Sequence, residues 1–417
     1  MVNRIIMHID ANSAYLSWEA VWRLQHGDSL DLRAVPSVVG GNPETRHGIV
    51  LTKSIPAKRY GIQTGETIWE AVAKCPELII VPPNYSLYMQ CSQAFGNVLR
   101  EYSPLVEQYS VDEYFLDYTG CQGTFGDPVE AAYVIKNRIR DELGFTVNIG
   151  ISTNKLLAKM GSELQKPDKV HTLFPEEIPE KMWPLAVEEL FMVGRATSKK
   201  LYDRRIRTIG ELASADPKWL ELFLKSHGRL IWNYANGRDV SLVRIKRQPV
   251  VKSMGNSTTI AFDAEDRKTA HLVLMSLVET VSARLRAAGY CCRLVSVSIK
   301  TNEFYYSSHQ RKLYDATDCT NTIHRVACEL FDELWKGQPV RHLGVSAAEL
   351  CGNDFLQMSL FEEDNEKQRA VDKTIDEIRK KHGSLAVQRA SFLNSGLKPM
   401  TGGTGEESEY PMMSSLL

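Results

Sequence analysis

An apolar run near the N-terminus, Ile5-Ile6-Met7-His8-Ile9-Asp10, ends at a carboxylate. Short apolar runs rich in β-branched residues are typical of buried strands. Asn12 or Ser13 can cap a helix that is expected to continue toward Leu24. Asp10 would then lie at the end of a buried strand, beside a helix start whose free backbone N–H groups can hold a phosphate.

Strands and helices are expected to alternate along the rest of the chain. Further strands are expected at residues 78–81, 107–118 (two strands around an acidic turn) and 146–151, with helices at 85–102, 131–143 and 154–164. This alternation predicts an α/β or α+β first part. Short helices are expected from 188 to about 236, and strands and helices return at 250–350, where 294–300 is the clearest strand. One more helix is expected at 365–382, before a tail rich in Gly, Ser and Glu.

Length and composition limit the class of protein. The chain has 417 residues, of which 43% are hydrophobic, so roughly two to four soluble domains are expected. No apolar stretch approaches the roughly 18 residues that cross a membrane, and the N-terminus lacks the features of a signal peptide. We therefore expect a cytoplasmic protein without a membrane partner. The eight cysteines form no Cys-x-x-Cys pair, which indicates reduced thiols.

The charged residues are distributed unevenly. The net charge is only −1, but residues 241–312 carry twelve Lys or Arg and five Asp or Glu, a net charge of +7. Residues 195–207 carry six basic side chains against Asp203 alone, whereas residues 362–366 are acidic. Basic segments of this kind favour contact with a phosphate backbone on chosen faces of the protein. The alternative is an ordinary solvated surface of mixed charge.

Two further carboxylates, Asp112 and Glu113, are adjacent in the sequence. Because successive side chains of a strand point to opposite faces, they converge with Asp10 only if a hairpin bend lies beside them. Three carboxylates brought together repel one another, so cations must neutralise them. Mg²⁺ prefers oxygen ligands, and two ions about 3.5–4 Å apart can support phosphoryl transfer. The alternative is that Asp10 is a surface turn residue and Asp112 and Glu113 form a solvated hairpin tip.

Three motifs together resemble the Y family of DNA polymerases, the DinB/UmuC lesion-bypass group. They are Ile9-Asp10-Ala11-Asn12-Ser13-Ala14-Tyr15-Leu16-Ser17-Trp18-Glu19, Ser110-Val111-Asp112-Glu113-Tyr114-Phe115-Leu116-Asp117, and Gly150-Ile151-Ser152-Thr153-Asn154-Lys155-Leu156-Leu157-Ala158-Lys159 with Lys166-Pro167 after it. Their order and spacing match over residues 4 to about 390, and three motifs in register are far more specific than one. The resemblance favours the metal site over the hairpin-tip alternative.

The resemblance implies a multidomain α+β fold. Its parts are a palm with a mixed sheet and a two-metal acidic site, small fingers, a helical thumb with a helix-hairpin-helix, and an α/β little finger. The expected boundaries are 1–30 and 76–165 for the palm, 31–75 for the fingers, 166–237 for the thumb, 238–252 for a linker, 253–352 for the little finger, and 353–417 for a C-terminal motif, helix and flexible tail.

The thumb is expected to hold DNA by backbone groups. Residues 190–195 and 201–212 resemble a helix-hairpin-helix, which offers backbone N–H groups to phosphates. Met192 stands where a glycine is usual, so a distorted hairpin is expected. The alternative is an ordinary pair of helices.

The function implied by the resemblance is template-directed DNA synthesis of the translesion type. Asp10, Asp112 and Glu113 are then catalytic residues that bind two Mg²⁺ ions with the carbonyl of Ala11, and Glu113 lies nearest the primer 3′-hydroxyl. The implied partners are primer-template DNA and deoxynucleoside triphosphates, with accessory SOS proteins as a further class. The alternatives are a palm-fold nucleotidyl cyclase and a DNA-bound scaffold without catalysis.

Four side chains are implied to contact the incoming nucleotide. The ring of Tyr15 would collide with a 2′-hydroxyl and so reject ribonucleotides; the alternative is an aromatic that only anchors the helix. Lys159, one turn beyond Lys155, matches the triphosphate contact. Thr52 and Lys58, in the fingers motif, are further contacts.

The fingers motif, Thr52-Lys53-Ser54-Ile55-Pro56-Ala57-Lys58-Arg59-Tyr60-Gly61, departs from the usual family pattern. Ile55 stands where tyrosine is common and cannot donate a hydrogen bond. Lys58 stands where arginine is common and lacks the planar fork of a guanidinium. Ala14 is also smaller than the usual aromatic. These departures favour the UmuC-like branch of the group.

A short motif after the last domain indicates a partner. Gln357-Met358-Ser359-Leu360-Phe361 resembles the Gln-x-x-Leu-Phe peptide by which bacterial polymerases bind the sliding clamp. Leu360 and Phe361 would enter an apolar pocket of the clamp while Gln357 binds at its rim. The alternative is that Leu360 and Phe361 begin the following helix and pack on their own domain.

Overall fold

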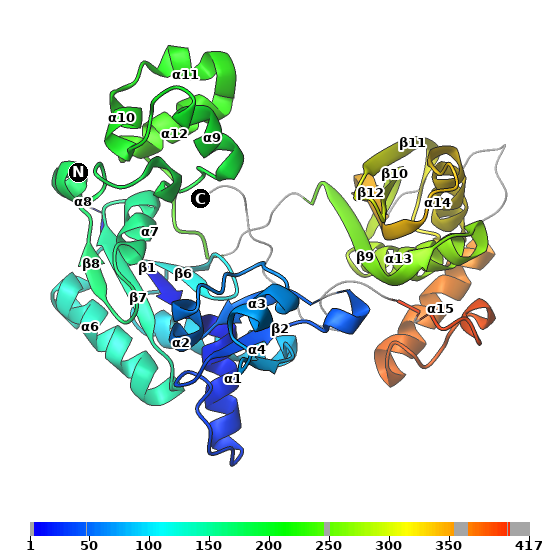
Figure 1. Cartoon of the computed structure of the whole chain (residues 1–417), viewed down its shortest axis with the longest axis horizontal. Coiled ribbons are helices and arrows are strands. Elements are labelled where there is room, and N and C mark those ends of the chain that lie inside the picture. The colour runs from blue at the N-terminus through cyan, green and yellow to red at the C-terminus, as the bar shows by residue number, and fades with distance from the viewer. Residues whose placement is uncertain (1–3, 47, 246–250, 354–365, 398, 401–417) are drawn as a thin grey trace.

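Three separate sheets organise the chain. The computed structural model describes residues 4–46, 48–245, 251–353, 366–397 and 399–400 (Figure 1). The sheets have five, three and four strands, and a set of short helices forms a further unit above the first sheet in the view of Figure 1. The chain is therefore multidomain and of the α+β class, as the sequence predicts.

The five-stranded sheet has the order β5-β6-β1-β7-β8. Its strands are β1 Ile6–Ala11, β5 Val106–Gln108, β6 Glu113–Asp117, β7 Val147–Ser152 and β8 Val170–Thr172. The central strand β1 pairs antiparallel with β6 and β7, and all six of its residues are buried. The predictions of a strand ending near Asp10, of two strands around the acidic turn and of a strand at 146–151 are confirmed. β8 lies within residues 166–237, yet it pairs with β7.

Helices cover both faces of this sheet. They are α1 Ala14–Gln25, α4 Tyr85–Arg100, α5 Gln122–Phe125, α6 Pro128–Arg138, η2 Ile139–Leu143 and α7 Lys155–Glu163. Met7 and Ile9 pack in one core with residues of α1, α4 and α6, whereas Ile6 packs in a second core with residues of α7. Because side chains alternate along a strand, Asp10 lies on the same face as Ile6, toward α7.

Close packing of α7 against β7 depends on one glycine. A Cβ atom on Gly150 would lie 2.0 Å from the carbonyl oxygen of Ala158 and 2.3 Å from the backbone nitrogen of Ser162. No other residue type allows the helix and the strand to approach this closely. The glycine therefore helps to fix the distance between α7 and the end of β1.

The start of α1 differs from the sequence-based expectation. Ser13 is in the left-handed conformation, with φ 47°, and its side chain makes no capping hydrogen bond. The amide of Asn12 donates instead to the hydroxyl of Thr146, at 3.2 Å. Ser13 therefore occupies the N-cap position of α1, as expected, but without a capping hydrogen bond from its side chain, whereas Asn12 makes a tertiary contact beside β7.

The three-stranded sheet forms a small unit with its own core. Its order is β3-β2-β4, with β2 Ser37–Gly40 parallel to β4 Ile79–Val81 and antiparallel to β3 Val50–Lys53. The same unit contains the short helices η1 Pro43–Thr45, α2 Ile55–Arg59 and α3 Ile68–Lys74. The strand predicted at 78–81 is confirmed.

The helical unit contains short helices, as predicted. They are η3 Pro175–Glu177, α8 Ile178–Lys181, η4 Val187–Glu189, α9 Arg195–Tyr202, α10 Ile209–Ser214, α11 Pro217–Leu224 and α12 Ser226–Ala235. Met192, in the turn before α9, has φ 74°, in the region that glycine tolerates best. The next residues, 239–244, lie against the first unit: the backbone N–H of Leu156 donates to Asp239, and that of Arg244 donates to Glu107.

The four-stranded sheet has the order β11-β10-β12-β9 and is antiparallel throughout. Its strands are β9 Ser253–Ala264, β10 Tyr290–Thr301, β11 Tyr306–Thr317 and β12 Val340–Gly352, and α13 Arg267–Ala287 and α14 Thr320–Leu334 cover one face. The strand predicted at 294–300 is confirmed as part of β10. One ion pair, Arg46 to Asp263 at 2.5 Å, joins this unit to the three-stranded unit.

The C-terminal helix packs back on the four-stranded unit. α15 Glu366–His382, followed by η5 Ala390–Phe392, confirms the helix predicted at 365–382. Arg369 pairs with the fully buried Asp318, and Arg286 of α13 pairs with Asp376 of α15. Gln357, Leu360 and Phe361 lie outside the described residues, as do residues 246–250 and 401–417. No helix in the described part of the chain is long and apolar enough to cross a membrane.

Candidate active site

The end of β1 meets the acidic turn between β5 and β6. Asp10 is directly opposite Glu113 in the antiparallel pairing, and the backbone N–H of Ala11 donates to the carbonyl of Asp112 at 3.0 Å. The hydroxyl of Ser110 donates to Asp112 at 2.6 Å and lies 3.3 Å from Glu113. The hairpin bend that the sequence required is therefore present, and the three predicted carboxylates lie around one strand end.

A fourth carboxylate, Glu163, joins them from the end of α7. Asp10, Glu113 and Glu163 each offer an oxygen atom within 4.8 Å of the other two, a spacing compatible with a shared cation. Asp112 is not in this closest group. Sequence reasoning missed Glu163, although it lies one helical turn beyond Lys159 and three residues before Lys166.

Two lysine ammonium groups form ion pairs with three of these carboxylates. Lys166 pairs with Asp10 and also, at 2.8 Å, with Glu163. Lys159 pairs with Glu113. Lys166, which follows the third motif, therefore has its ammonium group in the site, between Asp10 and Glu163. These ion pairs reduce the repulsion among the clustered carboxylates.

Lys155 is separate from the site. Its ammonium group lies 2.9 and 3.0 Å from the two carboxylate oxygens of Glu107, and both side chains are buried. It also lies 4.5 Å from the centre of the Phe115 ring. This buried pair holds α7 against β5 and β6, so of the two lysines on α7 only Lys159 faces the carboxylates.

Burial changes the protonation of two groups beside the carboxylates. Burial raises the pKa of Asp10 to about 7, and this effect outweighs the attraction of Lys166. Burial, followed by the charges of the neighbouring lysines, lowers the pKa of His8 well below its usual value. His8 is therefore neutral, and its Nδ1 atom lies 2.7 Å from the hydroxyl of Ser162.

Tyr15 is held in a cluster of aromatic rings near the start of α1. Its ring stacks on that of Tyr88, with centroids 4.5 Å apart and planes 8° apart, and meets Tyr85 edge-on. Thr52 lies on β3 opposite Val39. Lys58 is exposed on α2, and no ion pair within the described residues links it to the carboxylates.

Comparisons with known proteins identify the family of the chain. The impB/mucB/samB family matches residues 9–163, and its C-terminal domain matches residues 251–360. The chain is 46% identical over 394 residues to a DNA polymerase IV of Clostridium acetobutylicum, which covers 94% of the chain and 99% of that protein. It is 37% identical over 397 residues to a DNA polymerase IV of Acetivibrio thermocellus, with 94% and 98% covered.

The chain belongs to the Y family of DNA polymerases, in its DinB-type group.

Solved structures agree with the fold of this Y-family chain. A Y-family DNA polymerase chimera of Dbh and Dpo4 superposes with a TM-score of 0.72 at 23% identity, covering 84% of the chain and all of the chimera. An insertion ternary complex of Dbh DNA polymerase superposes with a TM-score of 0.55 over 82% of the chain and 98% of Dbh. The relatives named DNA polymerase IV favour the DinB type over the UmuC-like branch that Ile55 and Ala14 had suggested.

The Y-family chain is a template-directed DNA polymerase of the translesion type. The nucleotidyl cyclase and the non-catalytic scaffold therefore lose their support. A Y-family polymerase requires divalent metal ions, and the carboxylates around β1 supply suitable oxygen ligands.

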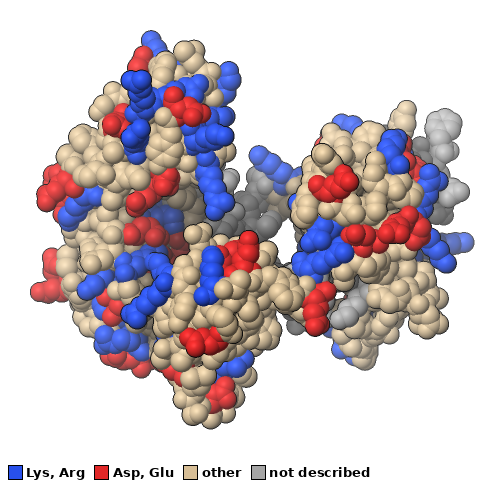
Figure 2. Space-filling model, viewed as in Figure 1, with Lys and Arg blue, Asp and Glu red and all other residues tan. Residues whose placement is uncertain are grey.

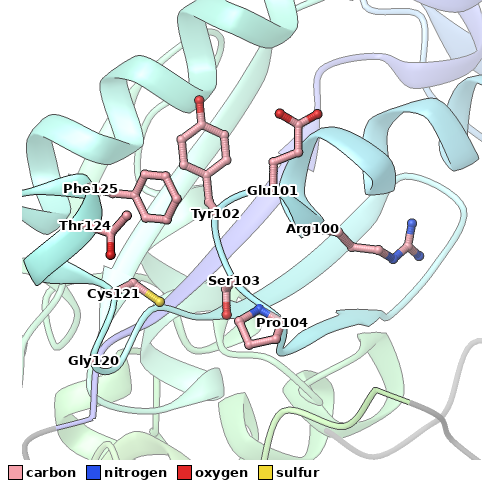
Figure 3. Close-up of a pocket in the computed structure, with 9 residues that line it drawn as sticks. All are labelled: Arg100, Glu101, Tyr102, Ser103, Pro104, Gly120, Cys121, Thr124 and Phe125. Atoms are coloured by element: carbon pink, nitrogen blue, oxygen red, sulfur yellow. The ribbon is translucent and has the colours of Figure 1, made fainter.

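A depression elsewhere on the polymerase, drawn in Figure 3, has none of these carboxylates among its lining residues. It is lined by Arg100, Glu101, Tyr102, Ser103, Pro104, Gly120, Cys121, Thr124 and Phe125. Its one carboxylate, Glu101, already pairs with Arg138 at 2.6 Å. We assign no chemistry to it.

Metal binding by this Y-family polymerase should depend on pH. The folded-state pKa of Asp10, about 7, lies above its ordinary value of 3.8. Between these values the folded chain therefore holds a proton that the unfolded chain has released, and the contribution of Asp10 to stability falls as pH rises. A divalent cation binds the ionised carboxylate, so Mn²⁺ affinity should rise by about tenfold per pH unit below pH 7 and level off above it.

Electron paramagnetic resonance of free Mn²⁺ would measure this affinity across the range, with Asp141→Asn, an exposed carboxylate distant from the site in sequence, as the matched control. Wild-type and control should give the same curve. An affinity for Mn²⁺ that does not change across pH 7 would contradict the assignment of Asp10 as the titrating ligand.

Proposed function

We propose that Asp10, Asp112 and Glu113, together with the carbonyl of Ala11, bind two Mg²⁺ ions at the end of β1 in this translesion polymerase. The observation that carries the proposal is the pairing of Asp10 with Glu113 across β1 and β6, with the carbonyl of Asp112 hydrogen-bonded to the backbone N–H of Ala11. The donors are all oxygen atoms, which suit Mg²⁺, and two of the carboxylates pair with lysines in the structure.

The ions would supply the positive charge that activates the primer 3′-hydroxyl and stabilises the leaving pyrophosphate. Glu113, on the side of Lys159, is the carboxylate proposed to lie nearest that hydroxyl. Asp10 must be ionised to act as a ligand, which its pKa of about 7 allows at neutral pH. Ser110 fixes Asp112 and Glu113 relative to each other through one hydroxyl.

Lys159 and Lys166 are proposed to contact the triphosphate of the incoming nucleotide. Both ammonium groups pair with carboxylates that would bind the metal ions. Metal binding would therefore free the two ammonium groups to contact the phosphates. Glu163 stays available to Lys166, at 2.8 Å, and would keep its side chain in the site. Thr52 and Lys58 are proposed as further triphosphate contacts from the three-stranded unit. Tyr15 is proposed to contact the sugar.

The units of the fold are proposed to hold the DNA as in the family. The five-stranded sheet would be the palm, the three-stranded unit the fingers, the helical unit the thumb and the four-stranded unit the little finger. Figure 2 shows Lys and Arg side chains over α9 and along the edge of the helical unit that faces the four-stranded unit. Positive charge on facing surfaces suits a phosphate backbone between them.

A sliding clamp is proposed as a partner through Gln357, Leu360 and Phe361. α15 begins at Glu366, five residues after Phe361, and is anchored on the four-stranded unit by buried ion pairs. In the sequence, the motif lies between β12 and this anchored helix. A tether of this kind raises the effective concentration of the polymerase at the primer end. We also propose a cytoplasmic location and accessory SOS proteins as partners.

Replacing Asp112 with alanine tests the proposed metal site. Asp112→Ala should abolish primer extension, because one of the metal ligands is lost. DNA binding should survive, because the proposed DNA contacts lie in other units. Extension and DNA affinity of the wild-type, Asp112→Ala and the surface control Asp141→Ala would be measured side by side. Extension by Asp112→Ala at the wild-type rate would exclude Asp112 from the catalytic site.

The proposed role of Tyr15 predicts a change in sugar discrimination. Tyr15→Ala removes the ring that would meet a 2′-hydroxyl, so the efficiency of ribonucleotide relative to deoxynucleotide incorporation should rise by at least about tenfold, or about 1.4 kcal/mol. Tyr15→Phe keeps the ring and should leave the ratio unchanged. Single-nucleotide kinetics with both sugars measure it. If the alanine variant keeps the wild-type ratio, Tyr15 only packs against Tyr88.

The clamp proposal predicts a selective loss of stimulation. Leu360→Ala combined with Phe361→Ala should leave short primer extension by the free enzyme nearly unchanged and remove its stimulation by the sliding clamp. Val371→Ala, which changes a half-exposed apolar residue of α15, is the matched control and should keep the stimulation. Loss of folding or of basal activity in the double variant would place these residues in the core and overturn the tether.

A further inference from the structure

The hairpin between β10 and β11 exposes three consecutive aromatic side chains. Phe304, Tyr305 and Tyr306 are 61%, 70% and 65% exposed. Single exposed aromatics are ordinary on a protein surface, but a contiguous group of large rings indicates a binding surface. No part of the proposed chemistry uses them.

The hairpin is ordered by its own backbone. Thr301 and Tyr305 are joined by a hydrogen bond of 3.0 Å, and the N–H of Asn302 donates to the carbonyl of Pro339 at 3.1 Å. Phe304 has φ 69°, a left-handed conformation that glycine or asparagine adopts at lower cost than a bulky residue. The backbone of the turn therefore does not favour phenylalanine at this position. We infer that the residue is present because its aromatic ring has a role.

Positive charge surrounds the aromatic group. The ammonium group of Lys300 lies 4.8 Å from the centre of the Phe304 ring, and the guanidinium carbon of Arg341 lies 5.2 Å from it. Because Val297 and Ile299 face the helices, Ser298 and Lys300 point to the open face of the sheet, as does Tyr306, which pairs with Lys300. Rings and cations together suit a ligand that has both π-faces and negative charge.

The hairpin lies at the end of the sheet that meets the three-stranded unit. Thr301 pairs with Val340, and Val340 pairs with Ala264 at the end of β9. The neighbouring Asp263 forms the ion pair with Arg46. The aromatic group is therefore at the side of the four-stranded unit nearest the proposed fingers, where a template strand would arrive.

We propose that the aromatic hairpin, residues 301–306, binds unpaired template bases ahead of the active site by stacking. This proposal rests on the proposed polymerase function. Exposed rings stack on any base, whereas the bases of a duplex are covered by their neighbours, so the surface selects single-stranded template. Lys300 and Arg341 would hold the phosphates of the same segment.

Fluorescence anisotropy with the full chain tests this proposal. One labelled primer-template carries a 5′ template overhang of about eight nucleotides, a length within the usual single-strand site sizes. A second is the same duplex with a blunt end, and a third has abasic residues in the overhang. The variant Phe304→Asn with Tyr305→Ser and Tyr306→Thr removes the rings while keeping residues that suit the turn and the strand.

The wild-type chain should bind the DNA with the overhang more tightly than the blunt DNA. The triple variant should lose about tenfold or more of its affinity for the overhang DNA and none for the blunt DNA. Abasic residues in the overhang should cause a similar loss with wild-type chain, a measurement that does not depend on folding of a variant. Tyr314→Ser removes a fully exposed ring from the other end of β11 and should keep the preference for the overhang.

Equal losses on overhang and blunt DNA, or equal wild-type affinity for normal and abasic overhangs, would overturn base stacking by the hairpin. Extension of the same primer by wild-type chain is measured in parallel. If extension occurs but the overhang adds no affinity, only the hairpin proposal fails. If wild-type chain extends no primer, the polymerase function on which the proposal rests fails with it.

Discussion

The antiparallel pairing of β1 with β6 determines most of this structure's chemistry. It places Asp10 opposite Glu113 at the end of a strand whose residues are all buried. Carboxylates brought together with little water raise the free energy of the folded chain unless cations compensate them. Burial raises the pKa of Asp10 to about 7, because the ionised carboxylate is less stable there than in water. A site under such electrostatic strain is suited to bind divalent cations tightly.

The surrounding elements supply and position the compensating charge. Gly150 lets α7 approach β7 closely, and the buried pair of Lys155 with Glu107 fixes the first turn of that helix. The later part of α7 then presents Lys159 to Glu113, and Lys166 follows it to reach Asp10. The two lysines stand where metal ions and a triphosphate would bring their own charges, and they offset only part of the negative charge of the carboxylates.

Local patterns predicted the strands well because burial and β-branching act within a few residues. The strand ending at Asp10 and the two strands around Asp112 needed only this local information, and the resemblance to the polymerase family implied that they meet. Glu163 and Lys166 were not assigned, because their roles depend on how α7 packs across the sheet. Ser13 was expected at the start of α1, but its left-handed backbone and the contact of Asn12 with Thr146 depend on tertiary packing that the local pattern does not show. Likewise, no pattern in residues 239–244 indicated their hydrogen bonds to Glu107 and Leu156.

The number of metal ions bound in the assembled site tests the central claim most directly. The full chain would be combined with a primer-template whose primer lacks its 3′-hydroxyl, a matching nucleotide and Mn²⁺, and bound ions would be counted by electron paramagnetic resonance. Two ions per chain are expected, since each side of the reacting phosphorus would need its own cation. A count of one ion, or none, would contradict a two-metal site built on Asp10, Asp112 and Glu113.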